Sequence, residues 1–248
     1  MHYDIPPGVY DVDLFDCPTF KMFHWHDCPR AQDILKYKSF EPMSMKLWCE
    51  LVKDAEVIID VGAHVGVYSL VAAALRHDII IDAFEPNPDC YARLVLHCNM
   101  NEFVNLIPYR NAIATKEEVV ALNFTTTKGD GYLQSGSQLG PRPKGRPSWG
   151  EVYVRTEHLS VEWKTLIKID VEDAERMVFE GMTGLENKPH ILLETFSQEN
   201  ADYITGVTKP HGYRYHLIHE DTMELEPMDR LIACDPKGKN FNQYLEPI

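Results

Sequence analysis

Short apolar runs rich in β-branched residues recur along the chain, and half of them are followed by a stretch with the apolar spacing of a helix. The strand-like runs lie at 57–61, 79–84, 104–109, 119–124, 152–155, 166–171, 191–195 and 213–218. The helix-like stretches lie at 67–76, 88–100, 174–182 and 201–209. Strands that alternate with helices of this length pair into a parallel sheet with helices on both faces. The sequence therefore predicts an α/β fold.

The length of 248 residues suits one α/β domain with added elements. Residues 1–52 are predicted to form an N-terminal cap, which is irregular up to about residue 30 because of its prolines and then helical. Residues 53–248 are predicted to form the main domain. The segment at about 125–150 is rich in glycine and proline and has almost no apolar pattern, so we expect a long inserted loop there.

The formal net charge of −14 disfavours nucleic acid and anionic membrane surfaces as partners. The most apolar stretch, 57–75, contains Asp60, His64 and two glycines, which makes it a poor membrane span. No apolar secretion signal is visible at the N-terminus. The six cysteines form no CxxC pair, so we interpret them as free thiols in a reducing compartment. We expect a cytoplasmic protein because no targeting signal is visible. No feature of the sequence defines an oligomeric state.

The turn after the first of these strands has small residues at a defined spacing. Asp60, Gly62 and Gly66 form the pattern D-x-G-x-x-x-G. Small residues here let a ligand approach the backbone, and the following helix directs its N-terminal amides toward that ligand. Glu85 ends the next strand, where a carboxylate can accept hydrogen bonds from both ribose hydroxyls of a nucleoside. The sequence thus predicts a cofactor that contains a nucleoside.

NAD and S-adenosylmethionine both bind in this way, and the glycine spacing separates them. The dinucleotide fingerprint GxGxxG needs glycines where this chain has His64 and Val67. The wider turn suits a methionine group and not a pyrophosphate. Two other interpretations remain: a nicotinamide-dependent oxidoreductase on the same fold, and a non-catalytic binding protein with a degenerate cofactor pocket. A plain tight turn in an unrelated α/β protein is the structural alternative.

Asn111 follows the third strand, where an amide can both donate to and accept from an adenine base. Asparagine is also a common turn residue, so a purely structural role fits it nearly as well.

Carboxylates gather where two later strands end. Asp170 and Glu172 follow the strand at 166–171, and ligands of open α/β sheets bind outside the carboxyl ends of the strands. We therefore expect both side chains beside the reacting groups. Asp173 and Glu175 lie near a helix N-terminus and are interpreted only as compensating the helix dipole. Glu194 ends the following strand and is predicted to bind substrate or a metal, or to be a strand-end charge.

These segments together resemble the FkbM-type methyltransferase family. The resemblance rests on IDVGAHVGVYSL at 59–70, AFEPNP at 83–88 and IKIDVEDAERMVFEG at 167–181, and it extends over roughly residues 31–218. It implies a Rossmann-like class I methyltransferase fold, a mostly parallel seven-stranded sheet whose seventh strand is antiparallel. It also implies S-adenosylmethionine as the methyl donor, S-adenosylhomocysteine as the product, and O-methylation of a sugar, glycan, glycolipid or other small molecule.

The resemblance also assigns residues to the predicted sites. The cofactor site would contain the following residues of the shared motifs: Asp60, Gly62, Ala63, His64, Gly66, Tyr68, Glu85, Asn87 and Asn111. Glu41 lies where the family often has a glutamate before the first strand and is added to the cofactor site. Asp170 and Glu172 would line the reaction site as catalytic residues. Glu194 is predicted to bind substrate from its position at a strand end, not from the resemblance. The chain departs from the family at His64, where asparagine is usual, and at Asp173, where glycine is usual.

A hydroxyl acceptor needs help to lose its proton, because its pKa is high. Asp170 or Glu172 is expected to act as the base, or both bind a divalent cation that acidifies the hydroxyl. The segment 24–28 is rich in histidine, but its residues alternate along an extended stretch, so no zinc site is predicted there. A nucleic-acid methyltransferase would need a basic stripe, and the one local basic cluster, at 142–146, would serve an anionic sugar or lipid head group equally well.

Overall fold

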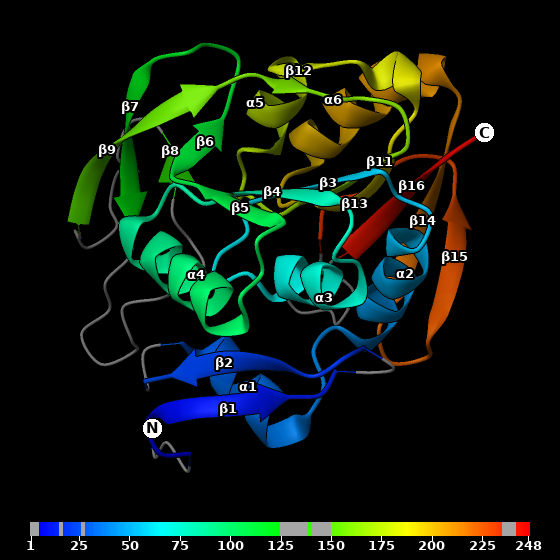
Figure 1. Cartoon of the computed structure of the whole chain (residues 1–248). Coiled ribbons are helices and arrows are strands. Elements are labelled where there is room, and N and C mark those ends of the chain that lie inside the picture. The colour runs from blue at the N-terminus through cyan, green and yellow to red at the C-terminus, as the bar shows by residue number, and fades with distance from the viewer. Residues whose placement is uncertain (1–4, 15–16, 26–27, 125–137, 140–149, 235–241) are drawn as a thin grey trace.

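The computed structural model describes residues 5–14, 17–25, 28–124, 138–139, 150–234 and 242–248. Its centre is an eight-stranded sheet with the order β15-β14-β16-β13-β11-β3-β4-β5 (Figure 1). The strands of this main sheet are β3 (Val57–Val61), β4 (Ile80–Phe84), β5 (Leu106–Tyr109), β11 (Thr165–Ile169), β13 (His190–Glu194), β14 (Tyr213–His219), β15 (Glu224–Met228) and β16 (Asn242–Pro247).

The middle of the main sheet is parallel and its far side is antiparallel. β13, β11, β3, β4 and β5 run in one direction. β16 runs against both β13 and β14, between which it is inserted. This arrangement is the predicted Rossmann-like class I methyltransferase sheet, in which one inner strand is antiparallel.

The sheet also has an eighth strand that the predicted seven did not include. β15 pairs antiparallel with β14 at the edge of the sheet. Its sequence, ELEPM, combines two glutamates with a proline, and most of its residues are exposed. Proline and charged residues are tolerated on edge strands, so this strand has no alternating apolar pattern for sequence reading to detect.

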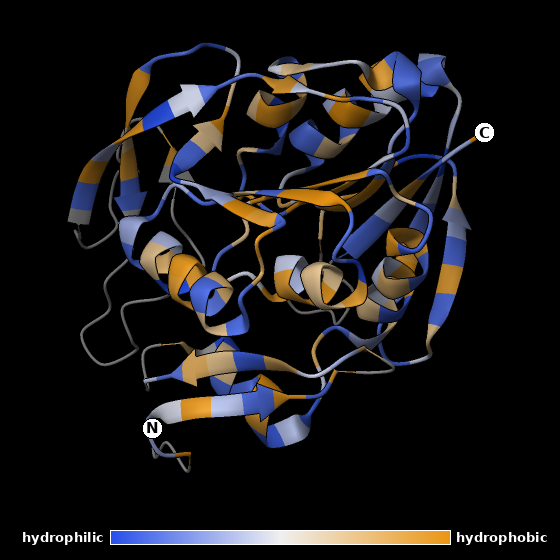
Figure 2. Ribbon diagram, in the orientation of Figure 1, coloured by the Kyte–Doolittle hydropathy of each residue, from blue (hydrophilic) through white to orange (hydrophobic). Residues whose placement is uncertain are grey.

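Helices cover both faces of the main sheet (Figure 1). α2 (Pro42–Val52), α3 (Val67–Leu75) and α4 (Pro88–Asn101) lie on one side. α5 (Glu175–Glu180) and α6 (Gln198–Thr208) lie on the other. Two separate clusters of buried apolar residues fill the layers between the sheet and these helices. The central strands are hydrophobic along most of their length because both of their faces are covered (Figure 2).

The N-terminal segment is more regular than the sequence indicates. Residues 8–24 contain an antiparallel pair, β1 (Gly8–Val12) and β2 (Phe20–His24), followed by α1 (Pro29–Tyr37). The expectation of an irregular segment is therefore wrong for these two strands. β2 is attached to α4, because Phe23 N donates to His97 Nε2 at 3.0 Å and Arg93 donates to Phe23 O at 3.1 Å. Several residues of the cap, including Phe20 and Met22, belong to the same apolar cluster as the main sheet.

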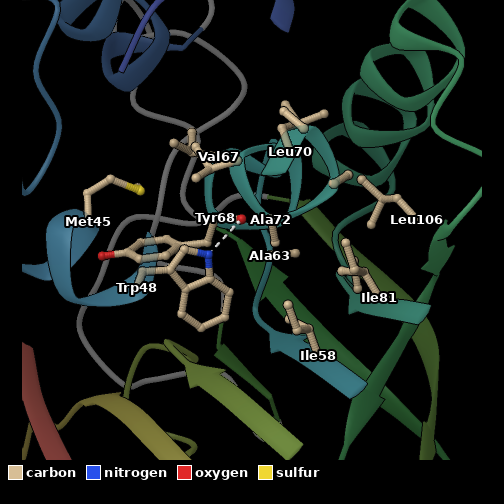
Figure 3. Packing of buried hydrophobic residues seen from close by; sticks show 14 of the residues in the cluster. Met45, Trp48, Ile58, Ala63, Val67, Tyr68, Leu70, Ala72, Ile81 and Leu106 are labelled. Atoms are coloured by element: carbon tan, nitrogen blue, oxygen red, sulfur yellow. Dashed lines mark hydrogen bonds between the residues drawn. The ribbon is translucent and has the colours of Figure 1, made fainter. Parts of the chain in front are cut away.

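Trp48 joins the cap to the turn region of the main domain. Its side chain is fully buried on α2, and its Nε1 donates to Tyr68 O at 3.1 Å (Figure 3). The Trp48 and Tyr68 rings meet edge to face with centroids 5.3 Å apart. Because Tyr68 lies in the first turn of α3, this contact fixes α2 against the start of that helix.

A second, smaller sheet lies beside the main sheet. It has the order β6-β9-β7-β8 and consists of β6 (Asn111–Ile113), β7 (Val119–Phe124), β8 (Gln138–Leu139) and β9 (Gly150–Glu157). The remaining short elements are β10 (Leu159–Ser160), β12 (Met182–Thr183) and two 3₁₀ turns, Leu185–Asn187 and Lys209–His211. The loop predicted at about 125–150 lies mostly outside the described residues; its described parts are Gln138–Leu139, which forms β8, and Gly150, which begins β9.

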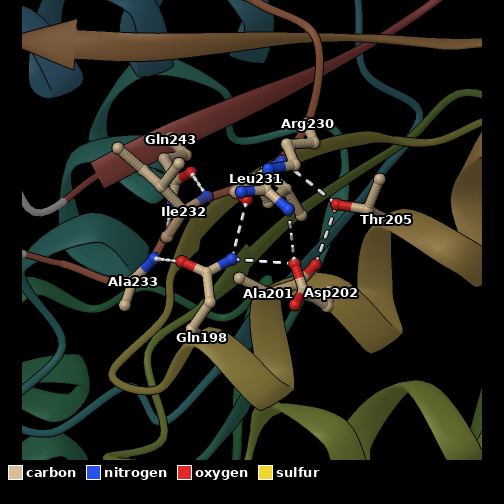
Figure 4. Close-up of polar contacts among 9 residues, drawn as sticks. All are labelled: Gln198, Ala201, Asp202, Thr205, Arg230, Leu231, Ile232, Ala233 and Gln243. Carbon is tan, nitrogen blue, oxygen red and sulfur yellow. Dashed lines mark hydrogen bonds and ion pairs between the residues drawn. The ribbon is translucent and has the colours of Figure 1, made fainter.

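The segment before β16 is held on α6 by side chains that bind its backbone (Figure 4). Leu231 N donates to Thr205 Oγ1 at 3.0 Å, and Ala233 N donates to Gln198 Oε1 at 3.1 Å. Gln243 Oε1 accepts from Ile232 N at 2.9 Å. These bonds satisfy backbone groups outside the sheet and anchor the chain shortly before it enters between β13 and β14.

The six cysteines are free thiols, as predicted, and Cys17 Sγ lies 2.9 Å from Cys49 Sγ. Within the described part of the chain, no helix is both long and apolar enough to cross a membrane.

Candidate active site

A cavity of about 520 Å³ opens where the parallel strands of the main sheet end. Residues that follow β3, β4, β11 and β13 line it, together with residues from the cap. The predicted site residues among its walls are Glu41, Asp60, Gly62, Ala63, His64, Tyr68, Glu85, Asn111, Asp170, Glu172 and Glu194. The fold thus brings together carboxylates and small residues that lie more than 150 positions apart in the sequence.

The turn between β3 and α3 is shaped by residues with positive φ. Gly62 has φ 84°, and His64 has φ 54°. The backbone N–H groups of Gly62 and Ala63 both donate to Phe84 O, at 2.9 and 3.0 Å. A Cβ on Gly62 would lie 1.9 Å from the carbonyl oxygen of Asp170. Only glycine fits this position, because the turn is pressed against the end of β11.

Gly66 and Asn87, which the sequence analysis placed at the cofactor, are absent from the cavity wall. Gly66 is the N-cap of α3, and a Cβ there would meet Leu94 Cδ1 at 2.4 Å. Asn87 is the N-cap of α4, and its side chain accepts from Asp89 N at 3.0 Å. The structure therefore gives both residues a role in shaping the turns beside the cavity, with no exposure to its interior.

Glu85 links the two turns. Its carboxylate accepts from His64 N at 2.7 Å and from Asn87 N at 2.8 Å. Burial raises the pKa of Glu85 to about 7, although these two backbone bonds act in the opposite direction. The neighbouring carboxylates of Asp60 and Asp170 raise it further. Glu85 therefore changes its charge close to neutral pH.

The carboxylates of Asp60 and Glu41 form hydrogen bonds that fix the part of the cavity wall between β3 and the cap. Asp60 Oδ2 accepts from Ser69 Oγ at 2.5 Å, and burial raises the pKa of Asp60 to about 6. Glu41 Oε2 accepts from Tyr68 OH at 2.6 Å and from Asn242 Nδ2 at 2.8 Å. Residues from the cap, α3 and β16 are therefore joined at one carboxylate.

Asn111 lies at the other end of the cavity, at the start of β6. Its Nδ2 donates to Glu157 Oε1 at 2.8 Å, so part of the amide is already used within the protein.

Glu194 and Asp170 face the cavity from neighbouring strand ends. Burial raises the pKa of Glu194 to about 9, and the charge of Asp170 adds to this effect. Glu172 also lines the cavity. Its φ of 52° lies in the left-handed region, which residues other than glycine rarely adopt. The strand ends therefore present several carboxyl groups to one space.

Glu175 lies in the first turn of α5, where it can compensate the helix dipole, and it has a further structural role. Glu175 is fully buried, with Oε1 accepting from Asp173 N at 2.8 Å and Oε2 accepting from Asn200 Nδ2 at 2.8 Å. Burial raises its pKa to about 7. The side chain thus ties the turn that carries Glu172 and Asp173 to α6.

Sequence reasoning missed Lys168, Glu220, Arg30 and Asn242, which also line the cavity. Lys168 was detectable, because a lysine in the middle of a strongly apolar strand needs a buried partner. Glu220 accepts hydrogen bonds from Met43 N at 2.7 Å and from Ser44 Oγ, and so caps the start of α2. No sequence signal connects Glu220 with Met43 and Ser44, which lie far from it in the sequence.

Among the residues that the structure describes, no three or more histidine, cysteine, aspartate or glutamate side chains are grouped to hold a metal ion. Of the histidine-rich segment, His24 is a buried residue of β2, while residues 26–27 lie outside the described ranges.

The family model for the FkbM methyltransferase domain matches residues 60–223. This match spans more than half of the chain, so the chain belongs to the FkbM methyltransferase family, as its motifs predicted. It is an enzyme, an S-adenosylmethionine-dependent methyltransferase. A search of curated proteins finds no match.

Solved structures of similar shape include three methyltransferases. A precorrin-6y C5,15-methyltransferase from Geobacter metallireducens is 12% identical, with 82% of this chain and 87% of that chain covered and a TM-score of 0.42. A SAM-dependent O-methyltransferase from Thermotoga maritima is 11% identical, with coverage of 89% and 72% and a TM-score of 0.42. A TehB-like SAM-dependent methyltransferase from Corynebacterium glutamicum is 8% identical, with coverage of 88% and 95% and a TM-score of 0.43.

The contact between Gly62 and Asp170 generates a testable prediction. We expect Gly62→Ala to lower the free energy of unfolding by at least about 2 kcal/mol, because the added Cβ collides with backbone and the residue has positive φ. We also expect it to weaken S-adenosylhomocysteine binding strongly. Urea unfolding and calorimetry measure the two effects.

Gly206→Ala is the matched control, because Gly206 lies in α6 with no atom near an added Cβ. It should stabilise the protein by about 0.5–1 kcal/mol through helix propensity. Equal stability and equal affinity in Gly62→Ala and the wild type would contradict the tight-turn interpretation.

Proposed function

We propose that the protein transfers a methyl group from S-adenosylmethionine to a hydroxyl oxygen of a sugar, a glycan, a glycolipid or another small molecule. The observation that carries this proposal is the cavity at the carboxyl ends of β3, β4, β11 and β13. Small residues and Glu85 follow β3 and β4, and Asp170, Glu172 and Glu194 follow the neighbouring strands β11 and β13.

The β3 and β4 side of the cavity suits the donor. Gly62 lets the turn lie close against the end of β11, because a Cβ there would collide with the Asp170 carbonyl oxygen, and α3 begins shortly after the turn. In this proposal Glu85 would accept the ribose hydroxyls, and Asn111 with the apolar Ile113 and Leu122, which also line the cavity, would contact the adenine. The carboxylates Asp60 and Glu41 favour the positively charged end of the donor.

The β11 and β13 side suits the acceptor. S-adenosylmethionine, when bound, supplies a methyl group on a positively charged sulfur; transfer breaks the sulfur–carbon bond and forms a carbon–oxygen bond. The protein must align the hydroxyl and accept its proton. We assign the proton acceptor to Asp170 or Glu172, with Glu194 orienting the acceptor through hydrogen bonds. Because Lys168 already places a cation beside Asp170, we assign no divalent cation to this mechanism.

The double variant Asp170→Asn/Glu172→Gln tests the assignment of the base. We expect turnover to fall by about 10³-fold or more, because neither amide accepts the hydroxyl proton, while S-adenosylhomocysteine affinity stays within about threefold. Transfer of label from methyl-labelled S-adenosylmethionine to a panel of sugars, glycolipids and small hydroxyl compounds measures turnover.

The control is Glu117→Gln/Glu118→Gln, which removes the same charge from exposed positions outside the cavity. Label transfer that is unchanged in the Asp170/Glu172 double variant would overturn the assignment. Transfer to amines alone, and not to hydroxyls, would overturn the proposed acceptor class.

The pKa of Glu85 predicts a pH-dependent donor site. The ionised form accepts two ribose hydroxyls and the protonated form loses that capacity, so affinity should be full above the pKa of about 7 and fall below it. We expect S-adenosylhomocysteine to bind the wild type about tenfold more weakly near pH 6 than near pH 8, as followed by calorimetry.

Glu85→Gln should bind about tenfold more weakly near pH 8 and lose most of this pH dependence. Asp89→Asn, an exposed neighbour outside the cavity, should keep the wild-type profile. A profile that is identical in Glu85→Gln and the wild type would exclude Glu85 from the ribose site.

A further inference from the structure

Lys168 is a buried cation with an unusual position in the middle of β11. Its side chain is 2% exposed and lies in the cavity wall. Its Nζ is 3.6 Å from Asp170 Oδ2 and 5.2 Å from the centroid of the Tyr68 ring. Among the described residues, Nζ has no hydrogen-bond partner. A buried ammonium group without hydrogen bonds is costly, so this one is expected to serve the ligand site.

Carboxyl groups greatly outnumber cations around Lys168. Seven carboxyl side chains line the cavity: Glu41, Asp60, Glu85, Asp170, Glu172, Glu194 and Glu220. The cations in the same wall are Lys168 and Arg30, and Arg30 lies on the exposed side of α1. Burial alone would lower the pKa of Lys168, but the surrounding carboxylates, Asp170 first, outweigh burial and raise it. Lys168 therefore stays charged at neutral pH.

The methyl donor and its product differ in the charge of one sulfur atom, and the ammonium group of Lys168 interacts differently with the two forms. S-adenosylmethionine carries a positive sulfur, and S-adenosylhomocysteine carries a neutral one. The carboxylates of the wall attract the positive sulfur, whereas an ammonium group in the same wall repels it. The neutral thioether is almost indifferent to both.

We propose that Lys168 sets the preference of the cavity between S-adenosylmethionine and S-adenosylhomocysteine by offsetting the attraction of the surrounding carboxylates for the sulfonium. This proposal rests on the proposed function. Without Lys168 the acidic wall would bind the charged donor too tightly. Binding that stabilises the donor more than the transition state slows transfer, because the sulfur loses its charge as the methyl leaves. Lys168 is thus a specificity-determining residue for the donor, distinct from the base.

The test compares Kd values for the two ligands and needs no acceptor. We measure S-adenosylmethionine and S-adenosylhomocysteine by calorimetry at one pH and low ionic strength in the wild type, Lys168→Met and Lys168→Arg. The ratio of the S-adenosylhomocysteine Kd to the S-adenosylmethionine Kd should rise about tenfold in Lys168→Met. Lys168→Arg should keep the wild-type ratio because it keeps the charge.

Lys164→Met is the matched control, since Lys164 is exposed and paired with Glu56 away from the cavity. Its ratio should equal that of the wild type. If Lys168→Met does not fold, Asp170→Asn gives the opposite test, because loss of a carboxylate should lower the ratio. A ratio that is constant across these variants while both affinities fall together would overturn the proposal and leave Lys168 a structural residue. Failure of the wild type to bind either ligand would instead overturn the proposed function.

Discussion

The close approach of the β3–α3 turn to the end of β11 is the contact on which the site depends. The backbone of Gly62 lies so near the carbonyl of Asp170 that no side chain fits between them. Asp170 N in turn donates to Val61 O at 3.0 Å, so a backbone hydrogen bond joins the ends of β3 and β11 beside this close contact. Through this contact the turn predicted to hold the donor and the carboxylates predicted to serve the acceptor share one cavity.

The second constraint is charge. Burial of several carboxyl groups around one cavity raises the pKa of Asp60, Glu85 and Glu194 above their usual values. Such groups favour the folded state at low pH and cost stability as pH rises through their folded pKa values. A positively charged ligand offsets this cost when it binds, and Lys168 offsets part of it in the protein alone. The acidity of the wall therefore fits a cationic donor better than a pyrophosphate.

Much of the cavity wall was predictable because its residues lie in local motifs. The strand-to-turn spacing identified Gly62 and Glu85, and the position of Asp170 after a buried strand placed it at the carboxyl edge. The same reading assigned Gly66 and Asn87 to the cofactor, because sequence alone does not separate a residue that shapes a turn from one that faces the space beside it. The buried role of Glu175 depends on Asn200, which no local pattern connects to it.

The elements that sequence reading missed have weak patterns or distant partners. β15 contains proline and charged residues, and its pairing depends on the turn after β14. β1 and β2 are short and lie close to prolines in the sequence, and β2 is held by a contact with α4. Lys168 stood inside a recognised motif, but its importance follows from the number of carboxylates that the fold gathers around it.

The most direct test of the account is a calorimetric titration of the wild-type protein with S-adenosylhomocysteine and, separately, with NADH. The account predicts one site per chain with micromolar affinity for S-adenosylhomocysteine and no binding of NADH. Binding of NADH alone would contradict the account, because it would show that the turn at Gly62 accommodates a pyrophosphate.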